Sequence, residues 1–520
     1  MHSRRACYLT AIVAIGLLIA AAFLTDDRMR GLAANTLLVS GCVALLGTAI
    51  GAPLAVVLFR TNIAGARLAI VSMSVLILIP LYLQAAAWIA AFGTRGWLAP
   101  SVGTGWLNGV LGTIWIHSAA SIPWVVLLVG SGLLTSEAEL EEEALLDASA
   151  AKVLRRVTLR RAATAGVIAA LWVAAVTSGD MTVTNLFQVR TFAEEVYTQF
   201  EADPDQIFLA SLPGVLATAM LVLSGLAIML SIAPANFEPT TRKLRRLPLG
   251  KWRMPVTLAT FAAIAVIALL PIASLAYKAG MYVSRTTAGW QQGWSVTKLL
   301  QMVASSPLRF SSEFEWSLLV ASLAATLAVI ISAPLAWYAR KSWALAMLLL
   351  LLITVCFATP GPVVGIALIR LVNRPEFPLL AYLYDETVLP TVVAQAVRAL
   401  PVVALVCWHA FRTLPHELLD AAESEGATAG AIFTRLALPM RRSALGAAWL
   451  IAFALALGEL PASLLVVPPG IDLLSVRIFN LIHYGVDDQV AGICLVLAAC
   501  FVVIGLVVIA ALRAREQSEL

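Results

Sequence analysis

Residues 316–340 read WSLLVASLAATLAVIISAPLAWYAR, and the first 24 of them carry no charge. About 20 mostly apolar residues are enough for a helix to cross a bilayer. The whole chain shares this character, because 61% of its 520 residues are hydrophobic and 12% are charged. Soluble domains carry about 25% charged residues. Composition therefore excludes a soluble enzyme, a disordered protein and a nucleic-acid-binding domain, and it predicts an all-α, polytopic membrane protein.

Other stretches resemble 316–339 in length and apolarity, so we expect about twelve transmembrane helices. Besides 316–339, the expected spans are 6–25, 36–59, 68–92, 109–133, 163–183, 207–233, 254–277, 343–369, 387–411, 443–467 and 489–512. Basic residues gather in alternate loops, which the positive-inside rule places in the cytoplasm. Both termini are then cytoplasmic, and we expect a multi-pass protein of the cell (inner) membrane. The first span also resembles a signal peptide, but its length favours retention.

The chain contains an internal repeat. Residues 35–60 resemble 316–340 at an offset of 280 or 281 residues, as Arg60 to Arg340 and Leu37 to Leu318 show. Ile122-Pro123 matches Leu400-Pro401, and Gly179-Asp180 matches Gly458-Glu459, at offsets of 278 and 279. A near-constant offset predicts two parallel six-helix repeats about an axis along the membrane normal. We expect one transmembrane domain at 1–233, a basic cytoplasmic linker at 234–255, and a second transmembrane domain at 256–520.

Two long cytoplasmic loops, 137–162 and 414–442, hold clusters of acidic residues and alanine. The first contains Glu142-Glu143-Ala144-Leu145-Leu146-Asp147-Ala148 and the second Asp420-Ala421-Ala422-Glu423-Ser424-Glu425-Gly426. Such residues favour a short helix, and a basic amphipathic segment follows each cluster. Each loop therefore predicts a helix–turn–helix that presents a knob to a cytoplasmic partner.

These loops resemble the EAA motif, E-A-A-x3-G-x9-I-x-L-P, of ABC importer permeases. In the second loop the motif positions are taken in order by Asp420, Ala421, Ala422, Gly426, Leu436, Leu438 and Pro439. In the first loop Glu142 stands at the Glu position, Ala148 at the Gly position, and Leu159 with Arg160 at the Leu-Pro positions after a one-residue deletion. Because 141–143 are all glutamate, that register stays open by one residue.

The resemblance implies a permease whose two loops are coupling helices that dock into an ATPase subunit, present in two copies. It also implies a periplasmic or lipid-anchored solute-binding protein. The fused layout and the stretches 458–463 and 474–480 most resemble the ferric-iron permease family, and related permeases for thiamine and aminoethylphosphonate share the layout. The chain itself shows no phosphate-binding G-x-x-x-x-G-K-[ST] motif. We therefore expect no enzyme activity and no directly bound cofactor, with ATP used by the partner.

Charged residues inside apolar spans are costly and suggest function. Arg398 and Glu459 each lie about 20–25 Å from the cytoplasmic side by helical rise, so we expect them to face each other, either as a structural pair or on the pathway. Asp180 is the repeat counterpart of Glu459. These two acids could line a cation route, since ferric iron prefers oxygen ligands, but no metal site is specified. Weaker pathway candidates are Tyr82, Gln84, His117 and Gln395.

Two other classes of function remain open. A secondary transporter also uses parallel repeats and would need no ATPase. The other alternative is a membrane scaffold without transport activity.

Overall fold

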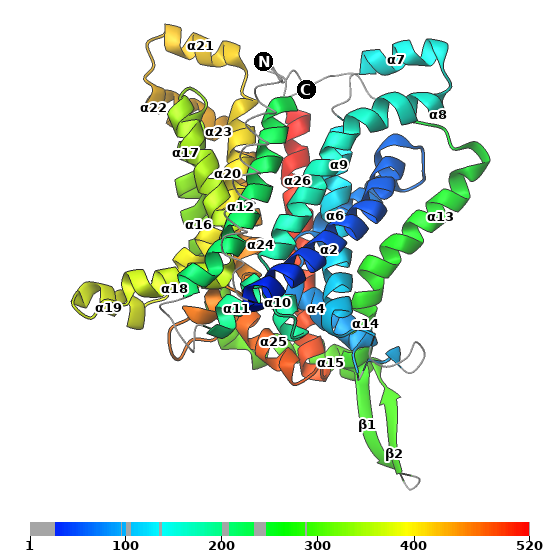
Figure 1. Ribbon diagram of the computed structural model, residues 1–520, viewed down its shortest axis with the longest axis vertical. Helices are drawn as coiled ribbons and strands as arrows, with labels where there is room; N and C mark the ends of the chain where they lie inside the picture. The colour runs from blue at the N-terminus through cyan, green and yellow to red at the C-terminus, as the bar shows by residue number, and fades with distance from the viewer. Residues whose placement is uncertain are drawn as a thin grey trace. The chain divides into compact units, whose positions relative to one another are not determined.

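The computed structural model describes residues 27–94, 96–99, 106–134, 138–199, 207–232, 246–286 and 289–518. This part of the chain is almost entirely helical (Figure 1), and it includes one antiparallel hairpin of β1 (Met281–Thr286) and β2 (Gly289–Trp294). The predicted class, an all-α polytopic membrane protein, is therefore confirmed, although the hairpin was not expected. The first expected span, 6–25, and the linker residues 234–245 lie outside the described residues.

The described chain forms two compact units. Unit 1 comprises the residues up to Ser306 together with Leu481–Ala498, and unit 2 comprises Pro307–Asn480 and the residues from Ala499 onward. These units differ from the expected domains, because 250–280 lies in unit 1. The last helix of this segment, α14 (Leu270–Gly280), packs against α4 (Leu81–Phe92). The Trp97 indole donates a hydrogen bond to the Ser274 hydroxyl at 3.1 Å.

Unit 1 is built around the long helix α2, which packs against α6 and α9. Its helices are α2 (Asp27–Arg60), α3 (Ala66–Leu76), α4 (Leu81–Phe92), α6 (Gly109–Leu134), α7 (Ala138–Asp147), α8 (Ala150–Val153), η1 (Leu154–Thr158), α9 (Leu159–Ser178), α10 (Thr182–Leu186), α11 (Phe192–Gln199), α12 (Ile207–Ile232), η2 (Gly250–Trp252), α13 (Arg253–Ile264), η3 (Ala265–Leu269), α14 (Leu270–Gly280) and most of α15 (Val296–Arg309). Small residues allow α2 to approach α6 closely. A Cβ on Gly51 would lie 2.7 Å from that of Val125, which is well inside van der Waals contact. A larger residue at Gly51 would therefore separate the two helices.

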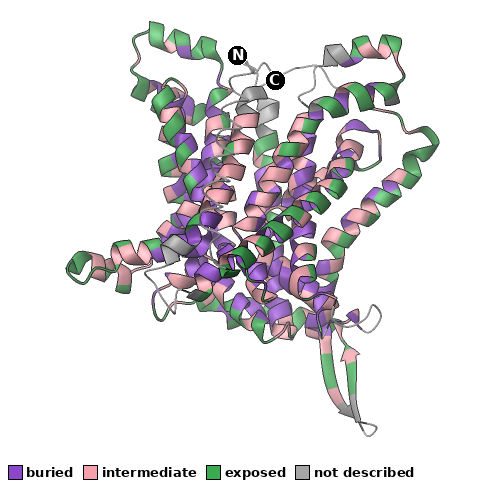
Figure 2. Ribbon diagram, viewed as in Figure 1, coloured by how far each residue is buried: buried purple, intermediate pink, exposed green. Residues whose placement is uncertain are grey.

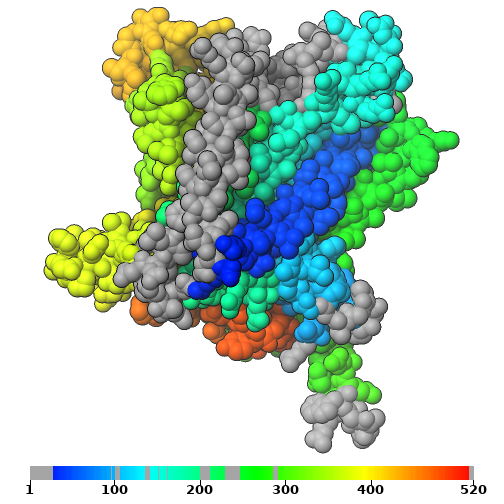
Figure 3. Space-filling view, viewed as in Figure 1, coloured from blue at the N-terminus to red at the C-terminus, as the bar shows by residue number. Residues whose placement is uncertain are grey.

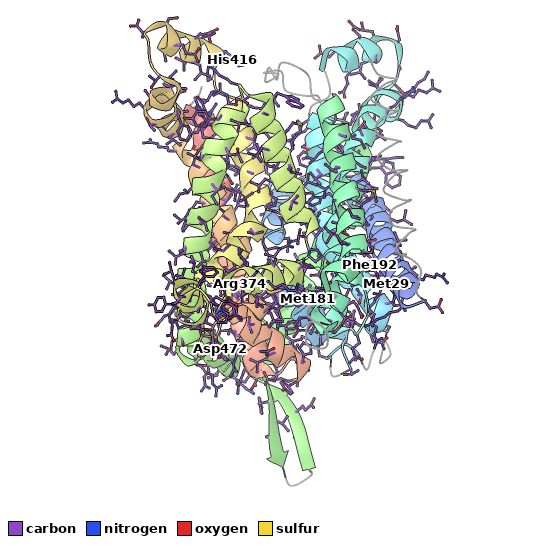
Figure 4. The ribbon with its side chains drawn as sticks, turned by 60° about the vertical axis from the view of Figure 1, so that its left-hand side comes forward. Met29, Met181, Phe192, Arg374, His416 and Asp472 are labelled. Carbon is purple, nitrogen blue, oxygen red and sulfur yellow. The ribbon has the colours of Figure 1, made fainter. Side chains whose placement is uncertain are left out.

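Unit 2 repeats this plan, with α16 packed against α20 and α24. Its helices are α16 (Ser311–Ala339), α17 (Trp343–Ala358), α18 (Gly361–Val372), α19 (Pro378–Asp385), α20 (Leu389–Arg412), α21 (His416–Ser424), α22 (Ala429–Ile432), η4 (Phe433–Ala437), α23 (Leu438–Met440), α24 (Arg442–Leu457) and η5 (Ser463–Leu465), with α25 (Leu474–His483) and α26 (Asp488–Ser518) shared between the units. His416, which begins α21, lies at one end of this unit, and Arg374 and Asp472 lie at the other (Figure 4). The loop 414–442 therefore occupies one end of unit 2.

Seven described helices are long and apolar enough to cross a membrane, or ten spans if each bent pair counts as one. The expected spans 68–92 and 343–369 are bent by 107° and 105°, at Pro80 and Pro360. Proline lacks the donor that a continuous helix needs, so each of these spans is broken in two. The expected fifth span, 163–183, contains a shorter apolar helix.

The spanning helices carry many exposed residues (Figure 2), and large apolar residues are among them. On α2, for example, Leu37 and Leu45 are 70% and 71% exposed. Exposed apolar surface of this extent marks a lipid or protein interface in a protein that is stable. Helices of this length and composition are expected to face lipid.

Several local features recur in the two units at the offset of the sequence repeat. The bent pairs at 66–92 and 343–372 occupy matching positions, and Pro123 in α6 matches Pro401 in α20. A one-turn π-helix precedes α9 as η1 and recurs as η4. The Thr36 hydroxyl accepts the Phe192 N–H at 3.2 Å, and Ser317 accepts the Leu474 N–H at 2.8 Å. This recurrence supports the two-repeat interpretation.

Candidate functional site

The second of the two acidic loops forms a helix, a left-handed turn and a second helix. The turn is made by Gly426, whose φ is +80°. Its N–H donates to the Glu423 carbonyl at 2.9 Å, and the Ala427 N–H donates to the Ala422 carbonyl at 3.0 Å. Thr428 then caps α22 by accepting the Ala431 N–H at 3.3 Å. Glycine ends α21 here because other residues rarely adopt this conformation.

An apolar underside holds this loop on unit 2. Leu419 of α21 and Ile432 of α22 are buried in the same core. The rings of Trp337, Phe411 and Phe433 pack there with centroids 5.7–5.9 Å apart. Aromatic pairs at such distances are worth about 0.5–1.5 kcal/mol each beyond their buried area. The underside therefore positions a loop whose other face is open.

The loop projects from one end of unit 2 (Figure 3), and most of the residues predicted for partner docking are exposed on it. The exposed ones are Asp420, Ala421, Gly426 and Pro439, and the half-buried ones are Ala422, Leu436 and Leu438. The structure therefore brings them together on one projecting loop, as the helix–turn–helix interpretation requires.

The first loop has the same helix–turn–helix order but a different turn. The helix α7 ends at Asp147, and the Ala148 N–H still donates to the Ala144 carbonyl at 3.0 Å. Ala148 does not adopt a left-handed conformation. Glu142 and Leu159 are exposed, and Ala148 is half-buried. The predicted residues again share one loop, but this loop turns without a glycine.

A buried ion pair attaches the first loop to unit 1. Glu141 of α7 pairs with Arg60 at the end of α2, and the Thr158 hydroxyl donates to Glu141 Oε1 at 2.8 Å. Sequence reasoning placed the motif glutamate at Glu142 and missed this role for its neighbour. Two signals were available: the run of glutamates at 141–143, and the position of Arg60 at the helix end that precedes the loop.

A cavity of about 280 Å³ lies beside this ion pair. Its lining residues are Arg60, Glu141, Leu145, Ala148, Val153, Leu154, Thr158, Arg246, Leu247 and Pro248. The last three belong to the end of the linker, and the Leu247 N–H donates to the Arg60 carbonyl at 2.7 Å. At the position of Leu154 the second repeat has Phe433, which packs into the aromatic cluster. The two loops are thus attached differently, one by charge and one by aromatic packing.

The charged residues predicted inside spans also find partners. In unit 2, Arg398 Nε lies 3.7 Å from Glu459 Oε2, and Arg398 donates to the Thr359 carbonyl at 2.9 Å, at the bend between α17 and α18. Glu459 Oε1 accepts the Ala462 N–H at 2.9 Å. The expectation that Arg398 and Glu459 face each other agrees with this geometry.

The corresponding acid of unit 1 has a partner that we did not anticipate. Asp180 Oδ2 lies 3.3 Å from His117 Nε2 and accepts the Val183 N–H at 3.0 Å. His117 occupies the repeat position of Gln395, which instead donates to the Ser463 hydroxyl at 3.1 Å. The signal for this pair was His117 itself, which lies within one helical turn of Ala120, the counterpart of Arg398.

Two of the weaker pathway candidates remain, Tyr82 and Gln84. Tyr82 is buried, and the Gln84 side chain donates to the Ile79 carbonyl at 2.9 Å. In the part of the chain that the structure describes, no group of three or more His, Cys, Asp or Glu residues could hold a metal ion.

We expect the single reversals Arg398→Glu and Glu459→Arg each to lower thermal stability, because each places two like charges together. The double reversal should recover most of the loss, as the charges are then opposite again. Thermal unfolding of the purified chain in detergent measures this. Glu376→Gln, at an exposed glutamate of the same unit, is the control, and a double variant no better than the singles would contradict the pairing.

Comparison with known protein families finds a match for residues 324–518. They match the family described as "Binding-protein-dependent transport system inner membrane component". The spermidine/putrescine transport system permease protein PotC of Escherichia coli K12 is 27% identical over 122 residues, which is 23% of this chain. PotC of Shigella flexneri matches to the same extent. The chain spans 45% of the length of these relatives. The family and the relatives are transport proteins, not enzymes, and the matched part includes loop 414–442 and Glu459.

Proposed function

We propose that this chain is the permease of a binding-protein-dependent ABC importer, with two fused transmembrane repeats. The observation that carries the proposal is the projecting loop 414–442, built as a helix, a glycine turn and a second helix. It lies within the part of the chain that matches the transport family. Its exposed face suits the groove of an ATPase subunit, and its buried face transmits force to α16 and α20.

In this proposal the two loops, 137–162 and 414–442, lie on the cytoplasmic side and engage two ATPase subunits. A solute-binding protein delivers the solute on the opposite side. ATP binding by the partner closes the two ATPase subunits, the loops move with them, and the two repeats rock to change access. The different attachments of the loops, through Glu141 and through Phe433, make unequal docking an expected feature.

The solute in this proposal is a cation. Resemblance of the residues 458–463 and 474–480 favours ferric iron, whereas the relatives named above carry spermidine and putrescine in their names. Both are positively charged. The acids Asp180 and Glu459 are buried just after the ends of α9 and α24, and their negative charges are compatible with either cation. Thiamine, which is also cationic, remains within the class, and aminoethylphosphonate fits it least well.

Co-expression with the ATPase subunit of the proposed importer tests the proposal. We expect the tagged chain to retain that ATPase through purification in detergent, and Leu418→Asp to weaken the complex at least tenfold. Leu418 is a large apolar residue exposed on α21, and burial of such a residue at an interface is worth about 1.5–3 kcal/mol. Surface plasmon resonance with the purified ATPase gives the affinity.

Leu371→Asp is the matched control, since Leu371 is also an exposed leucine, 66% exposed against 45% for Leu418, but lies on α18, at the other end of unit 2. Equal losses for both variants, or no ATPase at all in the purified wild type, would refute the importer. A secondary transporter would behave in the latter way, and it would show uptake that depends on an ion gradient.

A further inference from the structure

Unit 1 contains a buried glutamate that has no counterpart in the second repeat. Glu194 lies on α11, where Phe192 matches Leu474 of α25 at an offset of 282 residues. The same offset places Val476 opposite Glu194. A carboxylate is therefore buried where the other repeat has an apolar residue. The repeated fold does not require this acid.

The next residue shows what a structural acid looks like at this place. Glu195 pairs with Arg28 near the start of α2. Its counterpart at the same offset, Arg477, lies 3.7 Å from Glu313 near the start of α16. The ion pair recurs in the second repeat with its charges exchanged. Glu195 is thus accounted for by packing, and Glu194 is not.

Glu194 is incompletely satisfied. The residue is 6% exposed, and its Oε2 has no hydrogen-bond partner among the residues that the structure describes. The Asn185 amide bonds the carboxyl group, and the Arg190 charge also acts to lower its pKa. Burial, followed by the neighbouring Glu195 charge, outweighs both and raises the pKa of Glu194. A buried carboxyl oxygen without a partner is costly in either protonation state. A bound cation would supply the missing partner.

Asn185 connects Glu194 to an exposed residue. This residue of α10 is half-buried, and its Oδ1 lies 3.2 Å from Nε2 of the exposed His483. The helices α10 and α11 follow α9 at the end of unit 1 opposite α7, and Met181 and Phe192 mark this end in Figure 4. In the proposed orientation this is the side on which solute arrives.

We propose that Glu194, assisted by Asn185, binds one cationic group of the transported solute on the outer side of unit 1. This inference rests on the proposed function for its physiological role, although the binding itself does not need the ATPase. A protonated amine and a metal cation share the required chemistry, which is a positive charge for the unpartnered oxygen. The neutral solutes of other permeases would gain nothing from this residue.

Thermal unfolding of the full chain alone, in non-ionic detergent, tests the site. The probes are spermidine for amines and Tb³⁺ for hard metal cations. A ligand that binds the folded state raises the midpoint in a concentration-dependent way. We expect one probe to raise the unfolding midpoint of the wild type. Glu194→Gln should need at least about 30-fold more of that probe for the same rise, the usual consequence of losing one charge of a buried pair.

Glu194→Val provides a second variant that should fold, because the second repeat carries valine there. It should lose the ligand response and unfold at a higher temperature than the unliganded wild type. Glu376→Gln should respond like the wild type. An unchanged response in both Glu194 variants, or no response of the wild type to either probe, would overturn the site. Failure of the importer proposal would show instead as loss of ATPase association with these shifts intact.

Discussion

Replacing Glu141 with leucine is expected to lower the free energy of unfolding by about 3–5 kcal/mol. The substitution leaves Arg60 charged and buried at the end of α2, where its side chain is 4% exposed. The lost partner also leaves the Thr158 hydroxyl without its acceptor. Thermal unfolding of the purified chain in detergent measures the loss, which is the largest that we expect for a single side chain outside the apolar spans.

The second repeat supplies a matched control. Glu423 pairs with Lys341 at the corresponding helix end, but both side chains are exposed. Glu423→Leu should therefore cost no more than about 1 kcal/mol. The double variant Arg60→Met with Glu141→Leu should regain much of the loss, because neither of the two buried charges remains. If Glu141→Leu were as mild as Glu423→Leu, the buried pair would not anchor the first loop.

This difference between the loops has a mechanical consequence. A buried ion pair resists separation in one direction, whereas the cluster of Trp337, Phe411 and Phe433 resists it by packing over a broad area. The cavity of about 280 Å³ beside Glu141 also leaves room for the first loop to shift. Force from a partner subunit would then reach the two repeats by different routes.

Much of the fold could be predicted from the sequence because a membrane constrains it strongly. Apolar length, basic loops and the offset between Arg60 and Arg340 all report on backbone architecture. The breaks at Pro80 and Pro360 were readable from proline chemistry, yet we expected continuous spans there because hydropathy does not register a bend. The placement of α14 in unit 1 depends on its contact with α4, which no local pattern encodes.

The sites were less predictable because side-chain partners are chosen in three dimensions. Arg398 and Glu459 could be paired from their depths along two helices, since both are charged. The His117–Asp180 pair was missed because histidine in a span more often signals packing than charge. Glu194 lies between two expected spans, and nothing in the sequence marks it; its significance depends on its burial and on Val476, which stands opposite it in the repeat.

In the proposed importer, replacing Gly426 with alanine is expected to weaken binding of the ATPase about 5- to 30-fold while leaving the transmembrane core intact. A left-handed conformation costs a residue with a side chain about 1–2 kcal/mol, which converts to this change in affinity if only the native turn docks. The added Cβ would meet no atom within 4 Å, so the cost is conformational alone. Affinity measured by surface plasmon resonance, with thermal unfolding alongside, separates docking from folding.

Gly430 offers the control, because it lies four residues further along, in α22, and an added Cβ there also meets nothing. Its φ is not positive, and alanine favours a helix by about 1 kcal/mol over glycine, so Gly430→Ala should bind the ATPase as the wild type does. The first loop provides a second control, because it turns at Ala148 without a left-handed residue. Ala148→Gly should therefore gain no affinity for the ATPase. Equal binding by Gly426→Ala and Gly430→Ala would mean that the left-handed turn is not part of the docking surface, and that the loop transmits force through its buried face alone.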